Sequence, residues 1–249
     1  MTRSAIRQSF DILVLIALMG LAWQGLYEYA GEVALTSPLE TAALSSQLIV
    51  SPDFWPHLEE TGLALVQGLV IAIVCGLAVG LTLGAHRLSA EVGEPILVAL
   101  YSIPKITLYP IILLFFGIGM PAKVAFGAIH GVIPIAIFSM GAIRNINPAY
   151  IRTAQAMRLS PWALARTILF PAAIPEIFTG FRVGFALTLV GTLLGEMFGS
   201  QRGLGYLLMV AMGTHDMAVI MSITLLLVLF SVLVSVILLS IDRYLHRFT

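Results

Sequence analysis

Charged residues are scarce in this sequence. They make up 10% of its 249 residues, whereas 59% are hydrophobic. A soluble globular domain carries about 25% charged residues, so the composition excludes an ordinary soluble domain. The formal net charge is zero, which removes the electrostatic case for nucleic-acid binding. Cysteine is nearly absent too: Cys75 stands alone in an apolar run, where it forms no internal disulfide and has no metal-ligand neighbours.

Signatures of catalysis are also missing. The five histidines are scattered, and neither a His-Glu-x-x-His motif nor a convincing nucleophile–base arrangement occurs. The chain has no G-x-x-x-x-G-K-[ST] phosphate loop. We therefore expect no catalytic residues, no metal site and no cofactor in this chain, and if it pumps, the energy must come from another polypeptide.

Long apolar runs dominate what is present, and several exceed the ~20 residues that a helix needs to cross a bilayer. Six spans are predicted, and the third is expected to be bent or broken because it contains Pro104 and Pro110. The fold class is therefore all-α, a polytopic membrane protein with about six transmembrane helices. The predicted spans are 10–30, 61–85, 95–117, 121–143, 173–198 and 218–241.

The distribution of arginine predicts the orientation. With the N-terminus inside, the cytoplasmic segments hold nine arginines, whereas the external ones hold Arg202 and, at the edge of a span, Lys123. The external stretch 31–60 has no Lys or Arg and is acidic. Both termini are therefore expected in the cytoplasm. The nine arginines are Arg3, Arg7, Arg87, Arg144, Arg152, Arg158, Arg166, Arg243 and Arg247, and the external acidic residues are Glu32, Glu40, Asp53, Glu59 and Glu60.

Two regions are predicted. Residues 1–60 form a first transmembrane helix and an external segment of short interfacial helices, and residues 61–249 form a core with five spans. Within the core, Gly76, Gly80 and Gly84 recur every four residues, a spacing that lets a neighbouring helix approach closely.

An amphipathic segment interrupts the apolar runs at 147–170. Asn147-Pro148 and Ser160-Pro161 each place a capping residue before a proline, which is typical of a helix start. Two short helices are predicted, 148–159 and 161–170, with Phe170-Pro171 ending the second. Ile151, Ala154 and Met157 form an apolar stripe on the first helix.

Two interpretations of this segment remain open from its residues alone. It is either an amphipathic connector on the cytoplasmic leaflet, with its arginines near anionic lipid, or a docking element that inserts into a groove on a soluble partner.

The segment "RTAQAMRLSPWALARTILFPAAIP" resembles the cytoplasmic loop of ABC importer permeases. That loop carries Glu-Ala-Ala, a glycine after three more residues, and an Ile/Val-Leu-Pro ending. The stretches "YSIPKITLYPIILLFFGIG" (101–119), "GAIRNINP" (141–148), "TGFRVGFALTLVGTLLGEMFG" (179–199) and "GLGYLL" (203–208) are similar to the nitrate/sulfonate/taurine branch of these permeases. The resemblance covers roughly residues 60–245.

The resemblance implies a type I ABC importer-like fold, in which this loop is the coupling helix that contacts the ATPase subunit. It also implies a second permease subunit, an external solute-binding protein and location in a bacterial inner membrane. The chain departs from the pattern because Arg152 replaces the glutamate, Thr153 the first alanine and Arg158 the glycine. The candidate coupling residues are Arg152, Thr153, Ala154, Met157, Arg158, Leu159, Ser160 and Pro161.

Lys105, Arg182 and Glu196 are charges inside predicted spans, where each costs at least ~2.5–3.5 kcal/mol at the bilayer centre. They are candidates for lining a pathway or for locking helices together. Arg182 and Glu196 are fourteen residues apart, ~21 Å along one helix, so each needs a partner on another element. Lys105 either meets a small anion or extends its ammonium group to the membrane surface.

We expect the transmembrane subunit of an ATP-driven importer for a small anion or small organic solute such as a sulfonate, nitrate, taurine or an aromatic acid. The alternatives are a secondary transporter driven by an ion gradient, which often shows repeated halves that are not apparent here, and a non-transporting membrane anchor.

Overall fold

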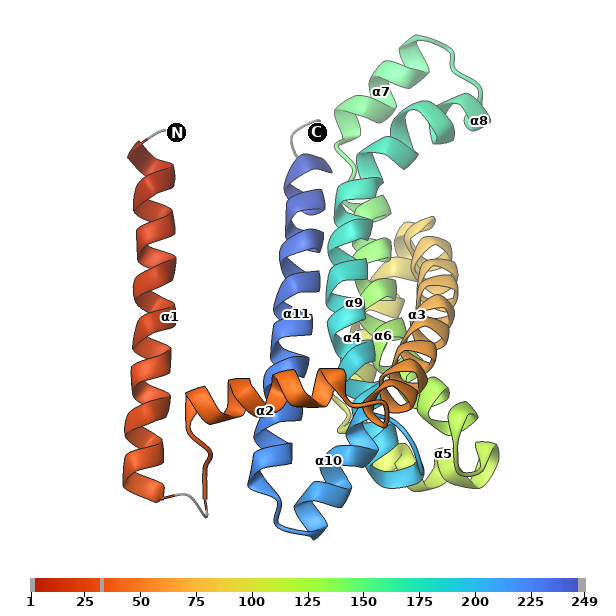
Figure 1. Ribbon diagram of the computed structural model, residues 1–249. Coiled ribbons are helices and arrows are strands. Elements are labelled where there is room, and N and C mark those ends of the chain that lie inside the picture. Colours follow the sequence, from red (N-terminus) through yellow and green to blue (C-terminus); the bar gives the residue numbers. More distant parts are fainter. Residues whose placement is uncertain (1–2, 32–33, 246–249) are drawn as a thin grey trace. The chain divides into compact units, whose positions relative to one another are not determined.

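The computed structural model of the chain describes residues 3–31 and 34–245 (Figure 1). Within these residues the regular structure is helical, and no strand occurs. The chain divides into two compact units, one of residues 1–55 with 207–230 and the other of residues 56–206 with 231–249. Glu32 and Arg247, which entered the prediction of orientation, lie outside the described residues, and the side chains of Arg3 and Arg7 are not described. The boundary placed at residue 60 stays a prediction.

Five helical stretches among the described residues are long and apolar enough to cross a membrane. A sixth span arises if α4 (Arg87–Ser102) and the stretch Lys105–Phe116, bent by 81°, count as one. The predicted number of spans is therefore confirmed, although the second begins at residue 54 rather than 61. The five stretches are Phe10–Ala30 within α1 (Arg3–Ala30), α3 (Phe54–Gly84), α6 (Met120–Arg144), Trp162–Gly199, which includes α9 (Phe170–Gly199), and α11 (Met217–Leu245).

The expected break in the third span lies where the prolines predict it. Proline disfavours the helical conformation of the residue before it, and Ile103 is extended with φ −65° and ψ 130°. A short 3₁₀ helix (Lys105–Leu108) follows and leads into α5 (Tyr109–Phe116). Pro110 lies in the first turn of α5, where a missing N–H costs no hydrogen bond.

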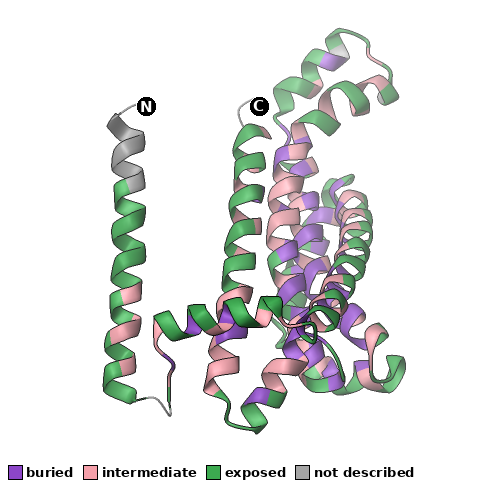
Figure 2. Cartoon of the chain, in the orientation of Figure 1, coloured by how far each residue is buried: buried purple, intermediate pink, exposed green. Residues whose placement is uncertain are grey.

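The larger unit is built around α6, which lies between α3 and α9. The glycine stripe on α3 contacts α6 as predicted: a Cβ atom at Gly76 would lie 2.7 Å from Ile135 Cβ, and one at Gly84 would lie 2.8 Å from the carbonyl oxygen of Met140. A second set of glycines on α9, not singled out in the sequence, faces α6 in the same way, since a Cβ at Gly195 would lie 2.9 Å from Lys123 Cα. Figure 2 shows buried residues gathered along α6 and α9.

The smaller unit contains α1, α2 (Pro38–Val50), and parts of α10 (Leu204–Gly213) and α11. Ser37 caps α2 by accepting a hydrogen bond from the backbone N–H of Glu40, and Pro38 begins the helix. In the described part of the stretch predicted to be external, one short helix precedes α3, which begins at Phe54, whereas several short helices were expected.

Candidate functional site

The segment predicted to couple to a partner projects from one end of the larger unit as α7 (Pro148–Ala156) and α8 (Pro161–Leu164) (Figure 1). Both predicted helix starts are confirmed. The Asn147 side chain accepts a hydrogen bond from the N–H of Ala149 at 2.9 Å, and the Ser160 hydroxyl accepts one from Ala163 at 3.2 Å. The bend between the two helices is thus fixed by a capping side chain on the second.

The first helix ends three residues before the predicted residue 159. The N–H of Leu159 donates to the carbonyl of Ala154 at 3.0 Å, and Arg158 has a left-handed backbone with φ 52°. This is the hydrogen-bonding pattern of a helix C-terminus that glycine usually closes. Arg158 stands where the resembled pattern has its glycine, so the backbone shape is kept although the residue type differs.

The predicted end of the second helix at Phe170-Pro171 is wrong. A π-helical turn (Ala165–Leu169) joins α8 to α9 without interruption, and the N–H of Phe170 donates to the carbonyl of Ala165. The π turn already interrupts the regular hydrogen-bond ladder, so the missing N–H of Pro171 falls where it is tolerated. The loop is therefore connected to a membrane-spanning helix by continuous helical backbone.

The three residues of the predicted apolar stripe differ in their exposure to solvent. Ala154 is buried at 1% exposure and Ile151 is half-buried, whereas Met157 is 66% exposed because the chain leaves the helix there. Trp162 is 75% exposed, and the sequence interpretation did not single it out. The sequence did contain a signal for this residue, because a large aromatic side chain directly follows a capping serine and a proline.

The remaining candidate coupling residues belong to the same segment. Arg152, Thr153, Arg158 and Ser160 are exposed or partly exposed, and Leu159 is half-buried. Thr153 donates its hydroxyl to the carbonyl of Ala149. Pro161 begins α8, and its side chain is not among those described. The arginines have no ion-pair partner within the described part of the chain, so the exposed end of the segment combines positive charge with apolar surface.

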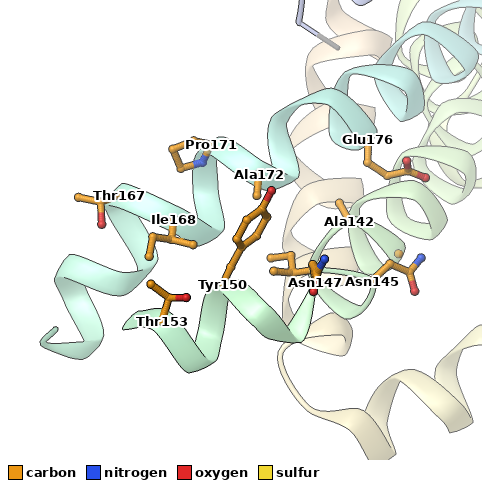
Figure 3. A pocket seen from close by; sticks show the side chains of 12 residues that line it. Ala142, Asn145, Asn147, Tyr150, Thr153, Thr167, Ile168, Pro171, Ala172 and Glu176 are labelled. Atoms are coloured by element: carbon orange, nitrogen blue, oxygen red, sulfur yellow. The ribbon is translucent and has the colours of Figure 1, made fainter. Parts of the chain in front are cut away.

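A cavity of about 690 Å³ lies between the end of α6, α7 and the start of α9 (Figure 3). Tyr150 points across it from α7 towards α9, and Glu176 and Asn145 lie on the side nearer the membrane-spanning helices. The residues that line the cavity are Gly141, Ala142, Asn145, Ile146, Asn147, Tyr150, Thr153, Thr167, Ile168, Pro171, Ala172 and Glu176.

A network of buried charges lies at the other end of the same unit. The ammonium of Lys123, completely buried on α6, lies 2.9 Å from Glu60 Oε1 and 3.4 Å from Glu196 Oε1. The sequence interpretation counted Lys123 with the external segments, whereas the structure buries its side chain between helices. It was missed because nothing in one sequence shows which helices bring carboxylates to it.

The carboxylate of Glu196 also binds the loop between α9 and α10. Glu196 accepts hydrogen bonds from the Thr61 hydroxyl at 2.9 Å and from the N–H of Gly205 at 3.0 Å. Thr61 in turn accepts a hydrogen bond from the N–H of Leu204. Glu196 therefore joins α3, α6, α9 and α10 through named contacts, a geometry suited to locking helices.

Arg182, the second predicted charge, lies 3.8 Å from Asp242 of α11. Both Arg182 and Glu196 thus find partners on other helices, as the spacing requires. Lys105 differs, because its ammonium contacts only the carbonyl of Tyr101 at 3.1 Å and the Tyr101 ring at 5.0 Å within the described residues.

Among residues 3–31 and 34–245, no three His, Cys, Asp or Glu side chains are arranged to hold an ion. Cys75 is exposed and unpaired with another cysteine.

The fold and these sites define a multi-pass helical membrane protein of the ABC importer permease class. Residues 68–249 match the family of binding-protein-dependent transport system inner membrane components, and the chain belongs to this family. The resemblance drawn from the sequence is confirmed.

Individual relatives support the same assignment. A probable ABC transporter permease of Haemophilus influenzae is 31% identical over 207 residues, which cover 83% of each chain. The riboflavin transport system permease of Chloroflexus aurantiacus is 32% identical and covers 82% of this chain and 76% of its own. Other relatives are named as permeases for aliphatic sulfonates, taurine, nitrate and bicarbonate.

A solved structure shares the fold. The MetNI methionine ABC transporter in an inward-facing conformation aligns with a TM-score of 0.60 at 23% identity, covering 77% of this chain and 93% of the matched one.

Proposed function

We propose that this chain is the transmembrane subunit of an ATP-driven importer and that residues 147–170 couple it to a separate ATPase. The observation that supports this most is the exposure of Met157 and Trp162 at the end of a segment whose backbone is fixed by caps. Exposed large apolar side chains in a segment that also carries exposed arginines are suited to insertion into a groove on a protein partner.

The continuous helix from α8 into α9 can transmit a movement of the loop to the membrane-spanning helices. A displacement of α8 moves the start of α9 directly, because the π turn connects them without a flexible break. The glycines of α9 hold it against α6 at close range, so the two helices move together. ATP binding and hydrolysis by the partner would in this way change the exposure of a pathway between helices.

The partners follow from the same proposal. ATP and Mg²⁺ are bound by the ATPase subunit, a second permease copy or homologue completes the pathway, and an external binding protein delivers the solute. The excess of arginine in one set of loops supports an orientation with both termini in the cytoplasm of a bacterium. Membership of the family favours ATP over an ion gradient as the source of energy.

The solute is proposed to be a small anion or a small organic molecule. Support comes from the relatives that are named for sulfonates, taurine, nitrate and riboflavin.

Met157→Ala tests the coupling role in the assembled complex. We expect the complex with the co-expressed ATPase to lose most of its ATP-dependent uptake into proteoliposomes while the permease still inserts and purifies. Leu39→Ala, which removes an equally apolar and 84% exposed side chain on α2, is the matched control and should transport normally. Equal uptake by both variants, together with unchanged uptake by Trp162→Ala, would refute the proposed contact.

A further inference from the structure

Lys105 differs from Lys123 and Arg182, two other cations inside the spanning stretches. Lys123 lies within ion-pair distance of two carboxylates and Arg182 of one. Lys105 has no carboxylate at such a distance among residues 3–31 and 34–245. A charge in an apolar region is stable only when it faces protein partners or water, so this ammonium requires a counter-charge or an aqueous route.

The contacts of Lys105 use little of its capacity to donate hydrogen bonds. An ammonium group has three N–H bonds, and one of them donates to the carbonyl of Tyr101 at 3.1 Å. The ring of Tyr101 lies 5.0 Å from the same nitrogen, which holds the side chain over the end of α4. The remaining donors have no acceptor within the described structure.

The neighbouring hydroxyl groups at the bend already donate hydrogen bonds to backbone carbonyl groups. The Ser102 hydroxyl donates to Val98 at 2.9 Å, and the Thr107 hydroxyl donates to Pro104 at 2.8 Å. Ile103 and Ile106, both at least 40% exposed, add apolar side chains close to the lysine in the sequence, and apolar surroundings strengthen the field of a charge. The ammonium is therefore the group at this bend that is equipped to receive an anion.

The backbone around Lys105 is also typical of a binding position. The span is broken at Ile103 and Pro104 and bent by 81°. Irregular backbone at membrane depth is tolerated where it is buried in protein or lines a water-filled cavity, and transporters place solute contacts at such breaks. A lysine with unused donors at the break favours the aqueous alternative.

From these contacts we infer that Lys105 is a solute-contacting residue that binds the anionic group of the transported molecule at the α4–α5 bend. This inference rests on the proposed function, because it assumes that the bend faces the pathway. The class of ligand it specifies is a small molecule with a sulfonate, carboxylate or similar oxyanion.

The test measures the field at the bend with charged thiol reagents. Cys75 is the sole native cysteine, so Cys75→Ser gives a background in which Ser102→Cys is the single reporter. Its rate of reaction is measured with an anionic sulfonate-bearing and a cationic trimethylammonium-bearing methanethiosulfonate, in purified permease. The ratio of the two rates is then compared among proteins with Lys105, Lys105→Gln and Lys105→Arg.

We expect Lys105→Gln to lower the anionic-to-cationic ratio at least about fivefold, as loss of one nearby positive charge in a partly apolar site requires. Lys105→Arg keeps the charge and should retain the ratio, which separates loss of charge from damage to the bend. An unchanged ratio in Lys105→Gln, or no reaction of the Ser102→Cys reporter with either reagent, would overturn the inference. The assay needs no ATPase, so a failure to couple to ATP would refute the proposed function and leave this result standing.

Discussion

Lys123 and Glu196 lie on adjacent helices with side chains that are completely buried, and Lys123 Nζ lies 3.4 Å from Glu196 Oε1 and 2.9 Å from Glu60 Oε1. The single ammonium of Lys123 therefore lies near two carboxylates, and that of Glu196 is buried from solvent. The strength of such a cluster lies in its completeness, because a buried ion left without its partner costs far more than the intact pair contributes.

Lys123→Met should destabilise the permease strongly. It leaves Glu60 and Glu196 close together without a counter-charge, a loss of about 3–5 kcal/mol for a buried pair. Thermal unfolding in detergent, followed by size-exclusion chromatography, measures the change. Lys123→Met combined with Glu196→Gln removes one of the unpaired charges and should recover part of the loss. A double variant as unstable as the sum of the single variants would show that the two side chains are not coupled.

Gly195→Ala should disrupt the contact between α9 and α6. The added Cβ would lie 2.9 Å from Lys123 Cα, and backbone cannot give way as a flexible side chain does. Overpacking of this kind costs about 1–3 kcal/mol. Gly62→Ala is the matched control, since a Cβ there meets nothing within 4 Å and a helix gains about 0.5–1 kcal/mol from the exchange. Melting temperatures that move in the same direction for both variants would contradict this packing.

The partly exposed pair of Arg182 and Asp242 should contribute much less to the stability of the permease than the pair of Lys123 and Glu196. The two groups are 3.8 Å apart, and their side chains are 28% and 14% exposed. Solvent screening reduces such a pair to about 0.2–1 kcal/mol. A double-mutant cycle with Arg182→Gln and Asp242→Asn measures the coupling directly from unfolding in detergent. A coupling energy as large as that between Lys123 and Glu196 would show that the pair is shielded from water in the membrane.

Local signals in the sequence predicted local structure well. Asn147-Pro148 and Ser160-Pro161 mark helix starts because capping is decided within four residues, and Ile103-Pro104 marks a break for the same reason. The spacing of Gly76, Gly80 and Gly84 predicted a close helix contact without revealing that the neighbour is α6.

Properties that depend on distant residues were not predictable in this way. Lys123 looks like a residue at a helix start, and only the fold brings Glu60 and Glu196 to it. The π turn before Pro171 is similarly hidden, because a proline in the sequence normally indicates the end of a helix. The exposure of Met157 follows from the left-handed backbone at Arg158. An arginine does not by itself predict a left-handed conformation.

Arg158→Gly should stabilise the end of α7. Arg158 has φ 52°, a left-handed conformation that costs an L-residue roughly 1 kcal/mol and glycine almost nothing. The amide of Leu159, which donates to Ala154 at 3.0 Å, should therefore exchange more slowly with deuterium in the variant. Arg152→Gly is the control with opposite sign: it places glycine inside the helix, where it costs about 1 kcal/mol, and should speed exchange across α7. Faster exchange at Leu159 in Arg158→Gly would mean that the arginine side chain makes a contact that outweighs the strain of its backbone.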